Sequence, residues 1–88
     1  MYQISEYSYK RARDLGVEIF ASKRKNKKID VFKNGKYLAS IGDNRYMDFP
    51  SILEKDGQEI ANKHRRLYHA RHKKDSGIAG KLALAILW

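Results

Sequence analysis

The sequence contains no cysteine, a single proline and few acidic residues, with 10 Asp and Glu against 19 Lys and Arg. The absence of cysteine excludes disulfides and thiolate zinc sites. No stretch approaches the roughly 20 apolar residues that span a bilayer. Glu6, Lys10 and Arg11 interrupt the N-terminal region, where a signal peptide needs an apolar core. We therefore predict a protein without a membrane partner that is not secreted by a signal peptide.

What the chain does contain is the composition of a globular protein, with 42% hydrophobic and 11% aromatic residues. A chain of 88 residues is too short to support two separate cores. We find no internal repeat and no linker. The sequence therefore predicts one domain, residues 1–88.

The clearest local signal is Asn34-Gly35, which lies between two runs rich in β-branched and aromatic residues. It predicts a hairpin over residues 29–41, and the alternation in residues 17–20 predicts a further strand. Residues 22–28 are expected to form a basic loop. The predicted register places three pairs opposite one another: Lys33 and Lys36, Phe32 and Tyr37, and Val31 and Leu38.

Helical periodicity predicts a long helix over residues 58–74 and three short ones, residues 5–15, 48–55 and 78–88. Six residues of the long helix fall within about 120° and are expected to face the core: Ile60, Ala61, His64, Leu67, Tyr68 and Arg71. Trp88 is expected to close the core. The fold class predicted is α+β: a small antiparallel sheet, made of the strand and the Asn-Gly hairpin, packed on the long basic helix with short flanking helices.

The formal net charge of +9 is concentrated in two blocks, one around the hairpin and one along the long helix. Patches of one sign on an ordered scaffold attract a polyanion, and nucleic acid is the commonest one. The alternative is that these charged residues form a solvent-exposed surface that only keeps the protein soluble. The predicted nucleic-acid-binding residues are Lys23, Arg24, Lys25, Lys27, Lys28, Lys33, Lys36, Lys63, Arg65, Arg66, His69 and Lys73.

No metal, cofactor or enzymatic site is predicted. His64, His69 and His72 do not share one helical face, and the acids form no arrangement typical of a nuclease. His64 is expected to be a core histidine. Arg71, on the apolar stripe, is expected to form a structural ion pair with Asp43 or Asp48.

Several motifs resemble a family of small basic proteins of unassigned function from large DNA viruses of algae and protists and from some phages. They are Ala39 to Asp43, Tyr46 to Pro50, Arg71 to Asp75 and the closing Leu87-Trp88. The family's paired aromatics after the last glycine are replaced here by Lys81-Leu82-Ala83. The resemblance covers nearly the whole chain. It implies a viral origin, and it implies no activity.

The function predicted from these observations is a virus-encoded, non-enzymatic nucleic-acid-binding protein associated with the genome, with DNA favoured over RNA. The alternative is a minor capsid or cement protein of the virion, whose basic surface meets capsid protein. The expected location is the interior of the host cell, with the virion as a second one.

Overall fold

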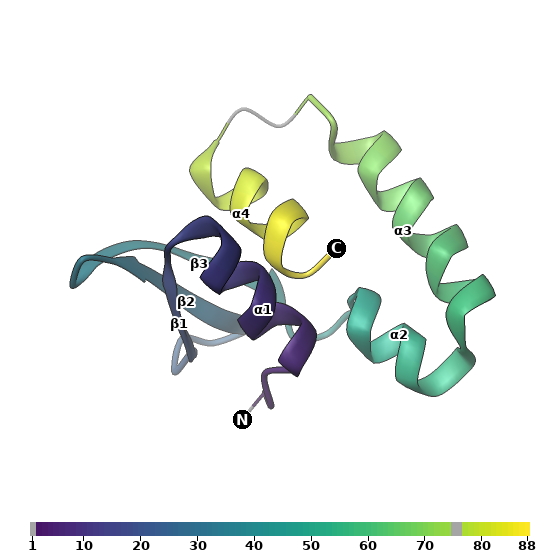
Figure 1. Ribbon diagram of the computed structural model, residues 1–88, viewed down its shortest axis with the longest axis horizontal. Helices are drawn as coiled ribbons and strands as arrows, with labels where there is room; N and C mark the ends of the chain where they lie inside the picture. The colour runs from purple at the N-terminus through teal and green to yellow at the C-terminus, as the bar shows by residue number, and fades with distance from the viewer. Residues whose placement is uncertain (1, 75–76) are drawn as a thin grey trace.

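The computed structural model describes residues 2–74 and 77–88 and shows four helices and three strands in these residues (Figure 1). The elements in chain order are α1 (Glu6–Leu15), β1 (Glu18–Ala21), β2 (Lys27–Lys33), β3 (Lys36–Asp43), α2 (Phe49–Asp56), α3 (Gln58–His72) and α4 (Ile78–Ile86). The strands form one antiparallel sheet in the order β1-β2-β3. The predicted α+β class is confirmed.

The helix ends follow the capping residues that the sequence supplies. The Ser5 side chain accepts a hydrogen bond from the Ser8 N–H and begins α1, and Gly16 ends it with φ 73°. Asp48 begins α2 in the way that Ser5 begins α1: its carboxylate accepts a hydrogen bond of 3.0 Å from the Ser51 N–H. Pro50 lies in the first turn of α2, where its missing N–H is no loss. These boundaries agree with the predicted ones to within two or three residues.

The hairpin turn has the expected geometry, but the register changes within it. Asn34 and Gly35 both have positive φ, 51° and 80°, as a type I′ turn requires. The predicted pairs of Lys33 with Lys36 and of Phe32 with Tyr37 are confirmed. The third pair is wrong, because an irregularity at Val31/Phe32 places Val31 opposite Ala39 instead of Leu38. The predicted loop is also shorter, because β2 already begins at Lys27.

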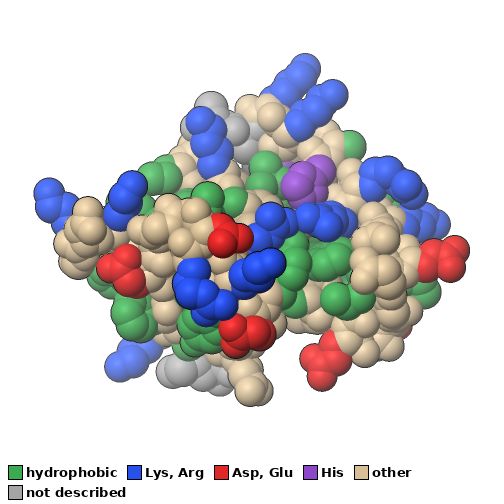
Figure 2. All heavy atoms as spheres, viewed as in Figure 1, with side chains coloured by type: hydrophobic (Ala, Val, Ile, Leu, Met, Phe, Trp, Pro, Cys, Tyr) green, Lys and Arg blue, Asp and Glu red, His purple; other side chains and the backbone are tan. Residues whose placement is uncertain are grey.

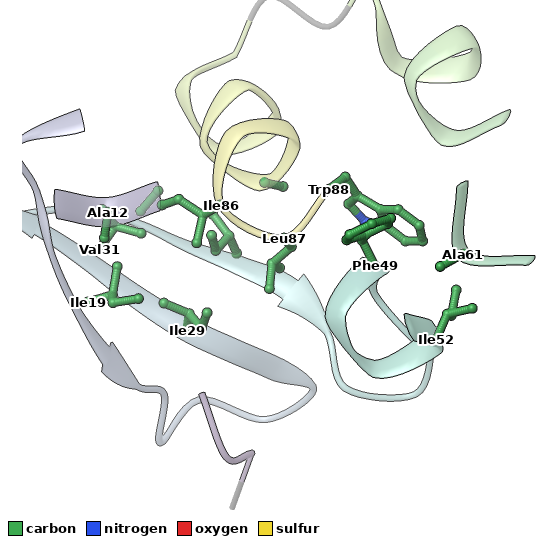
Figure 3. Close-up of a cluster of buried hydrophobic side chains, with 13 residues drawn as sticks. Ala12, Ile19, Ile29, Val31, Phe49, Ile52, Ala61, Ile86, Leu87 and Trp88 are labelled. Atoms are coloured by element: carbon green, nitrogen blue, oxygen red, sulfur yellow. The ribbon is translucent and has the colours of Figure 1, made fainter. Parts of the chain in front are cut away.

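The sheet packs on α1 and α4, and not on the long helix (Figure 1). The buried side chains of this layer come from one face of the sheet and from α4 with the residues after it: Ile19, Ile29, Val31, Ala39, Ile41, Ile86 and Leu87 (Figure 3). Fully burying an aliphatic side chain of this size contributes about 1.5–3 kcal/mol. The predicted packing of the sheet on the long helix is therefore corrected: α3 packs mainly against α2.

Leu87 and Trp88, which follow α4, join the layer formed by the sheet, α1 and α4 to the helix pair α2 and α3. The Phe49 N–H donates to the Leu87 carbonyl at 3.0 Å, and the Tyr7 hydroxyl donates to the Trp88 carbonyl at 3.3 Å. The Trp88 ring stacks on Tyr68 of α3, with centroids 4.3 Å apart and an interplanar angle of 9°. The expected core position of Trp88 is confirmed.

This stacking rotates α3 away from the predicted orientation. Ala61 is buried beside Ile52 (Figure 3), whereas Ile60 and Leu67 are 46% and 52% exposed. Arg65 turns inward instead, with its guanidinium 4.8 Å from the centre of the Phe49 ring. The helix face that packs is thus shifted by roughly 60° from the apolar stripe. In this orientation α3 is held by an aromatic stack and a cation–π contact, and not by burial of the Ile60 and Leu67 side chains.

We predict that Gly42→Ala destabilises the protein more than Gly16→Ala. Both glycines have positive φ, 77° and 73°, so both variants lose about 1–2 kcal/mol to backbone strain. A Cβ at Gly42 would also lie 2.7 Å from Leu87 Cδ1 and 3.0 Å from Lys28 Cδ, whereas none of the described atoms lies within 4 Å at Gly16. Urea denaturation measures both losses. Equal losses would show that β3 and Leu87 are not packed this closely.

Candidate nucleic-acid interface

The twelve predicted nucleic-acid-binding residues lie in three places. The β1–β2 connection and the start of β2 carry Lys23, Arg24, Lys25, Lys27 and Lys28; the β2–β3 turn carries Lys33 and Lys36; and α3 carries Lys63, Arg65, Arg66, His69 and Lys73. All are exposed except Lys28, which is buried, and Arg65, which is half-buried. Most of the predicted set is therefore available to a ligand.

The structure does not bring the two blocks together. The β2–β3 turn and α3 lie at opposite ends of the molecule, whose longest dimension is 37 Å (Figure 1). Figure 2 shows Lys and Arg side chains on the α3 side, in the middle of this face and at the opposite end. The basic residues at the β2–β3 turn and those on α3 therefore form separate surfaces.

Lys28 is a correction to the predicted interface. Its side chain is 5% exposed, and its Nζ lies 2.9 Å from Asp48 Oδ2. The ammonium also lies 5.3 Å from the centre of the Tyr2 ring. A charge enclosed in this way cannot reach a phosphate, so Lys28 is a structural residue.

Asp48 holds this buried network together. Burial raises the pKa of the Asp48 carboxyl, but hydrogen bonds from Tyr2, Lys28 and Ser51 outweigh it and hold the pKa below its ordinary value. The Tyr2 hydroxyl donates to Asp48 Oδ2 at 2.6 Å, and burial together with the adjacent carboxylate raises the pKa of Tyr2. The carboxylate thus stays charged and the phenol stays protonated. The sequence placed Asp48 at the start of a predicted helix, but it showed neither of the two distant partners, Tyr2 and Lys28.

The outward face of α3 and its C-cap carry a row of basic side chains, which we name the α3 cationic surface: Lys63, Arg66, His69 and Lys73. Ten residue steps separate the first and last of these side chains, which is about 15 Å of helix. None of the four takes part in an ion pair among the described residues. The acidic residue of α3 is Glu59, in the first turn. The surface is therefore an exposed positive field on a helix that is held in place by Trp88 and Phe49.

The sheet face opposite α1 and α4 carries three aromatic rings that sequence reasoning did not single out. The Phe32 ring stands edge-on to Phe20 and to Tyr37, with centroids 5.6 Å and 5.7 Å apart. The Arg24 guanidinium lies 4.9 Å from the centre of the Tyr37 ring. We name Phe20, Arg24, Phe32 and Tyr37 the sheet aromatic surface. The predicted pairing of Phe32 with Tyr37 already indicated that two of these rings lie side by side.

Arg71 and His64 lie in a hollow rather than in the core. The hollow, about 650 Å³, is formed by the end of β3, α2, α3 and Trp88. The expected ion pair of Arg71 is wrong, because Asp48 binds Lys28 and Asp43 binds Arg45 at 2.7 Å. Hydrogen bonds from Arg45 lower the pKa of Asp43 to about 2. His64 is exposed, so its expected place in the core is also wrong.

No group of three His, Asp or Glu side chains that could hold a metal ion occurs in residues 2–74 and 77–88. Among the helices that the structure describes, none has the length and apolar character to cross a membrane.

We predict that Asp48→Asn destabilises the protein strongly near pH 7 and weakly in acid. The variant leaves the buried Lys28 ammonium without its counter-charge, which costs about 3–5 kcal/mol. The folded pKa of Asp48 is depressed, so its stabilisation is present above the unfolded pKa of about 3.9 and is lost as the pH falls through the folded pKa. Urea unfolding from near pH 7 down to about pH 2 should show the two proteins converging.

The matched control is Asp43→Asn, which removes an exposed ion pair with Arg45. Exposed ion pairs contribute little to stability, so this variant should unfold almost as the wild type does at neutral pH. A constant gap between Asp48→Asn and the wild type at every pH would contradict the charged state assigned to Asp48.

Comparison with known proteins does not add a family to these observations. The chain matches no protein-family model, no curated protein and no solved structure. The viral origin drawn from its motifs stays a prediction, and the function is argued from the geometry of its surfaces.

Proposed function

We propose that this protein is a non-enzymatic nucleic-acid-binding protein that contacts the phosphate backbone with its α3 cationic surface. The observation that supports the proposal most is that Lys63, Arg66, His69 and Lys73 are exposed on one helix face and have no acidic partner among the described residues. Cations that are not neutralised within the protein remain available for an external polyanion.

The physical basis of binding is counterion release. Each phosphate that a Lys or Arg neutralises frees a condensed cation, and affinity for a duplex falls with salt by a log-log slope of about 0.9 per contact. Arg66 can donate two hydrogen bonds to one phosphate, whereas a lysine acts as a flexible point charge. A helix fixed by packing presents these donors without losing further backbone freedom on binding.

The chemistry of this surface favours backbone contact over base recognition. Phosphate contacts fix the position of a protein on a duplex but carry no sequence information. The chain shows no zinc finger and no other known reading motif. The proposed activity is therefore binding with little sequence preference, as association with a genome requires. DNA is the nucleic acid that we favour, in line with the motif resemblance.

Two triple variants with the same loss of charge test the proposal. Lys63, Arg66 and Lys73 are changed to Gln in one, and Lys23, Lys25 and Lys36 in the other, and each falls from +9 to +6. All six side chains are exposed, so both variants should stay folded. Fluorescence anisotropy against a labelled duplex, over a range of salt concentrations, measures affinity and slope.

We expect the α3 variant to lower the magnitude of the salt slope by up to about 2.7, and the second variant to change it by less than about one. A wild type that binds no duplex at low salt would remove the proposal and favour the capsid alternative. If only the second variant lost affinity, the duplex contact would lie on the connections of the sheet instead of on α3.

A further inference from the structure

The sheet aromatic surface has no role in the binding proposed for α3, yet it exposes large apolar rings to solvent. Phe20 is 56% exposed and Tyr37 is 42% exposed. Both lie beside Phe32, and α1 and α4 cover the other face of the sheet. Aromatic rings that adjoin one another on an open sheet face are typical of a binding surface.

The rings are held in place before any ligand arrives. Phe32 contacts both neighbours edge-on, at 81° to Phe20 and 72° to Tyr37. The Tyr37 hydroxyl and Ser40 Oγ are 2.8 Å apart, and Ser40 Oγ in turn donates to Asp30 Oδ1 at 2.6 Å. This chain of contacts limits the rotamers of the rings, so that little side-chain entropy is lost on binding.

The charge around the rings points to an anionic partner. The Arg24 guanidinium lies over the Tyr37 ring, and Lys23 and Lys25 are exposed in the same connection. A basic protein surface would be repelled here. A ligand that carries both flat rings and negative charge fits best, because it can stack on Phe20 and Tyr37 while its charges meet the cations.

We infer that the sheet aromatic surface binds single-stranded nucleic acid through its unpaired bases. The inference rests on the proposed nucleic-acid binding and names a second substrate class for it. A base can stack on an exposed ring only when it is not already stacked between neighbours in a duplex. This surface therefore prefers unpaired strands, whereas the α3 cationic surface contacts phosphate groups.

Two acids on the same sheet face work against binding. Glu18 pairs with Phe32 and Asp30 pairs with Phe20 in the strand register. The Asp30 carboxylate already accepts a hydrogen bond from Ser40, whereas Glu18 is exposed and is not in an ion pair among the described residues. Glu18→Gln should therefore strengthen binding of a single strand, by about two- to fivefold at low salt.

The test compares an oligothymidine of about 12 nucleotides, a length within the range of single-strand sites, with a duplex of the same length. Phe20→Ala/Tyr37→Ala removes two rings, and Ile60→Ala/Leu67→Ala is the matched control, since it removes two side chains of similar exposure from α3. We expect the first variant to bind the single strand at least about fivefold more weakly, with duplex affinity unchanged within about twofold. The control should bind both ligands as the wild type does.

A measurement on the wild type avoids any doubt about folding of the variants. Saturation with oligothymidine should shift the aromatic NMR signals of Phe20, Phe32 and Tyr37, while saturation with duplex should shift the signals of Lys63 and Arg66 instead. Ring signals that do not move with the single strand would overturn the inference, and so would an unchanged single-strand affinity in a folded Phe20→Ala/Tyr37→Ala variant. Duplex binding that survives in either case would leave the proposed function standing.

Discussion

The stacking of Trp88 on Tyr68 is the contact on which the arrangement of this molecule depends. Trp88 follows α4, which belongs to the layer that covers the sheet, and Tyr68 belongs to α3, which packs mainly against α2. The hydrogen bond from the Phe49 N–H to the Leu87 carbonyl secures the same junction one residue earlier. Together with the buried ion pair between Lys28 of β2 and Asp48 at the start of α2, these contacts hold the two parts in one orientation.

That orientation decides which residues of α3 meet solvent. With Tyr68 turned to Trp88 and Arg65 turned to Phe49, the row from Lys63 to Lys73 faces outward. Ile60 and Leu67 remain exposed as a result, at a cost in apolar burial that aromatic stacking offsets. The cationic surface is therefore a consequence of how the helix is anchored, as well as of its composition.

The basic residues of this protein have different roles, which depend on their surroundings. Lys28 neutralises Asp48 in the interior and stabilises the start of α2. The side chains of the α3 cationic surface instead face solvent and are in no ion pair among the described residues. Arg24 lies against an aromatic ring, where a guanidinium adds to stacking as well as to charge.

The sequence by itself determined the local structure, because each local signal involves residues that are close along the chain. Asn34-Gly35 specified the turn, Ser5 and Asp48 specified two helix starts, and helical periodicity located the helices to within a few residues. It also located the exposed cations of α3 correctly, apart from Arg65. Only the tertiary structure decided the rotation of α3 and the irregularity that placed Val31 opposite Ala39. It also decided the burial of Lys28 and the exposure of the sheet face that carries Phe20. Each of these depends on contacts between residues far apart in the chain, such as Tyr68 with Trp88 or Lys28 with Asp48, and periodicity along one segment carries no information about such partners.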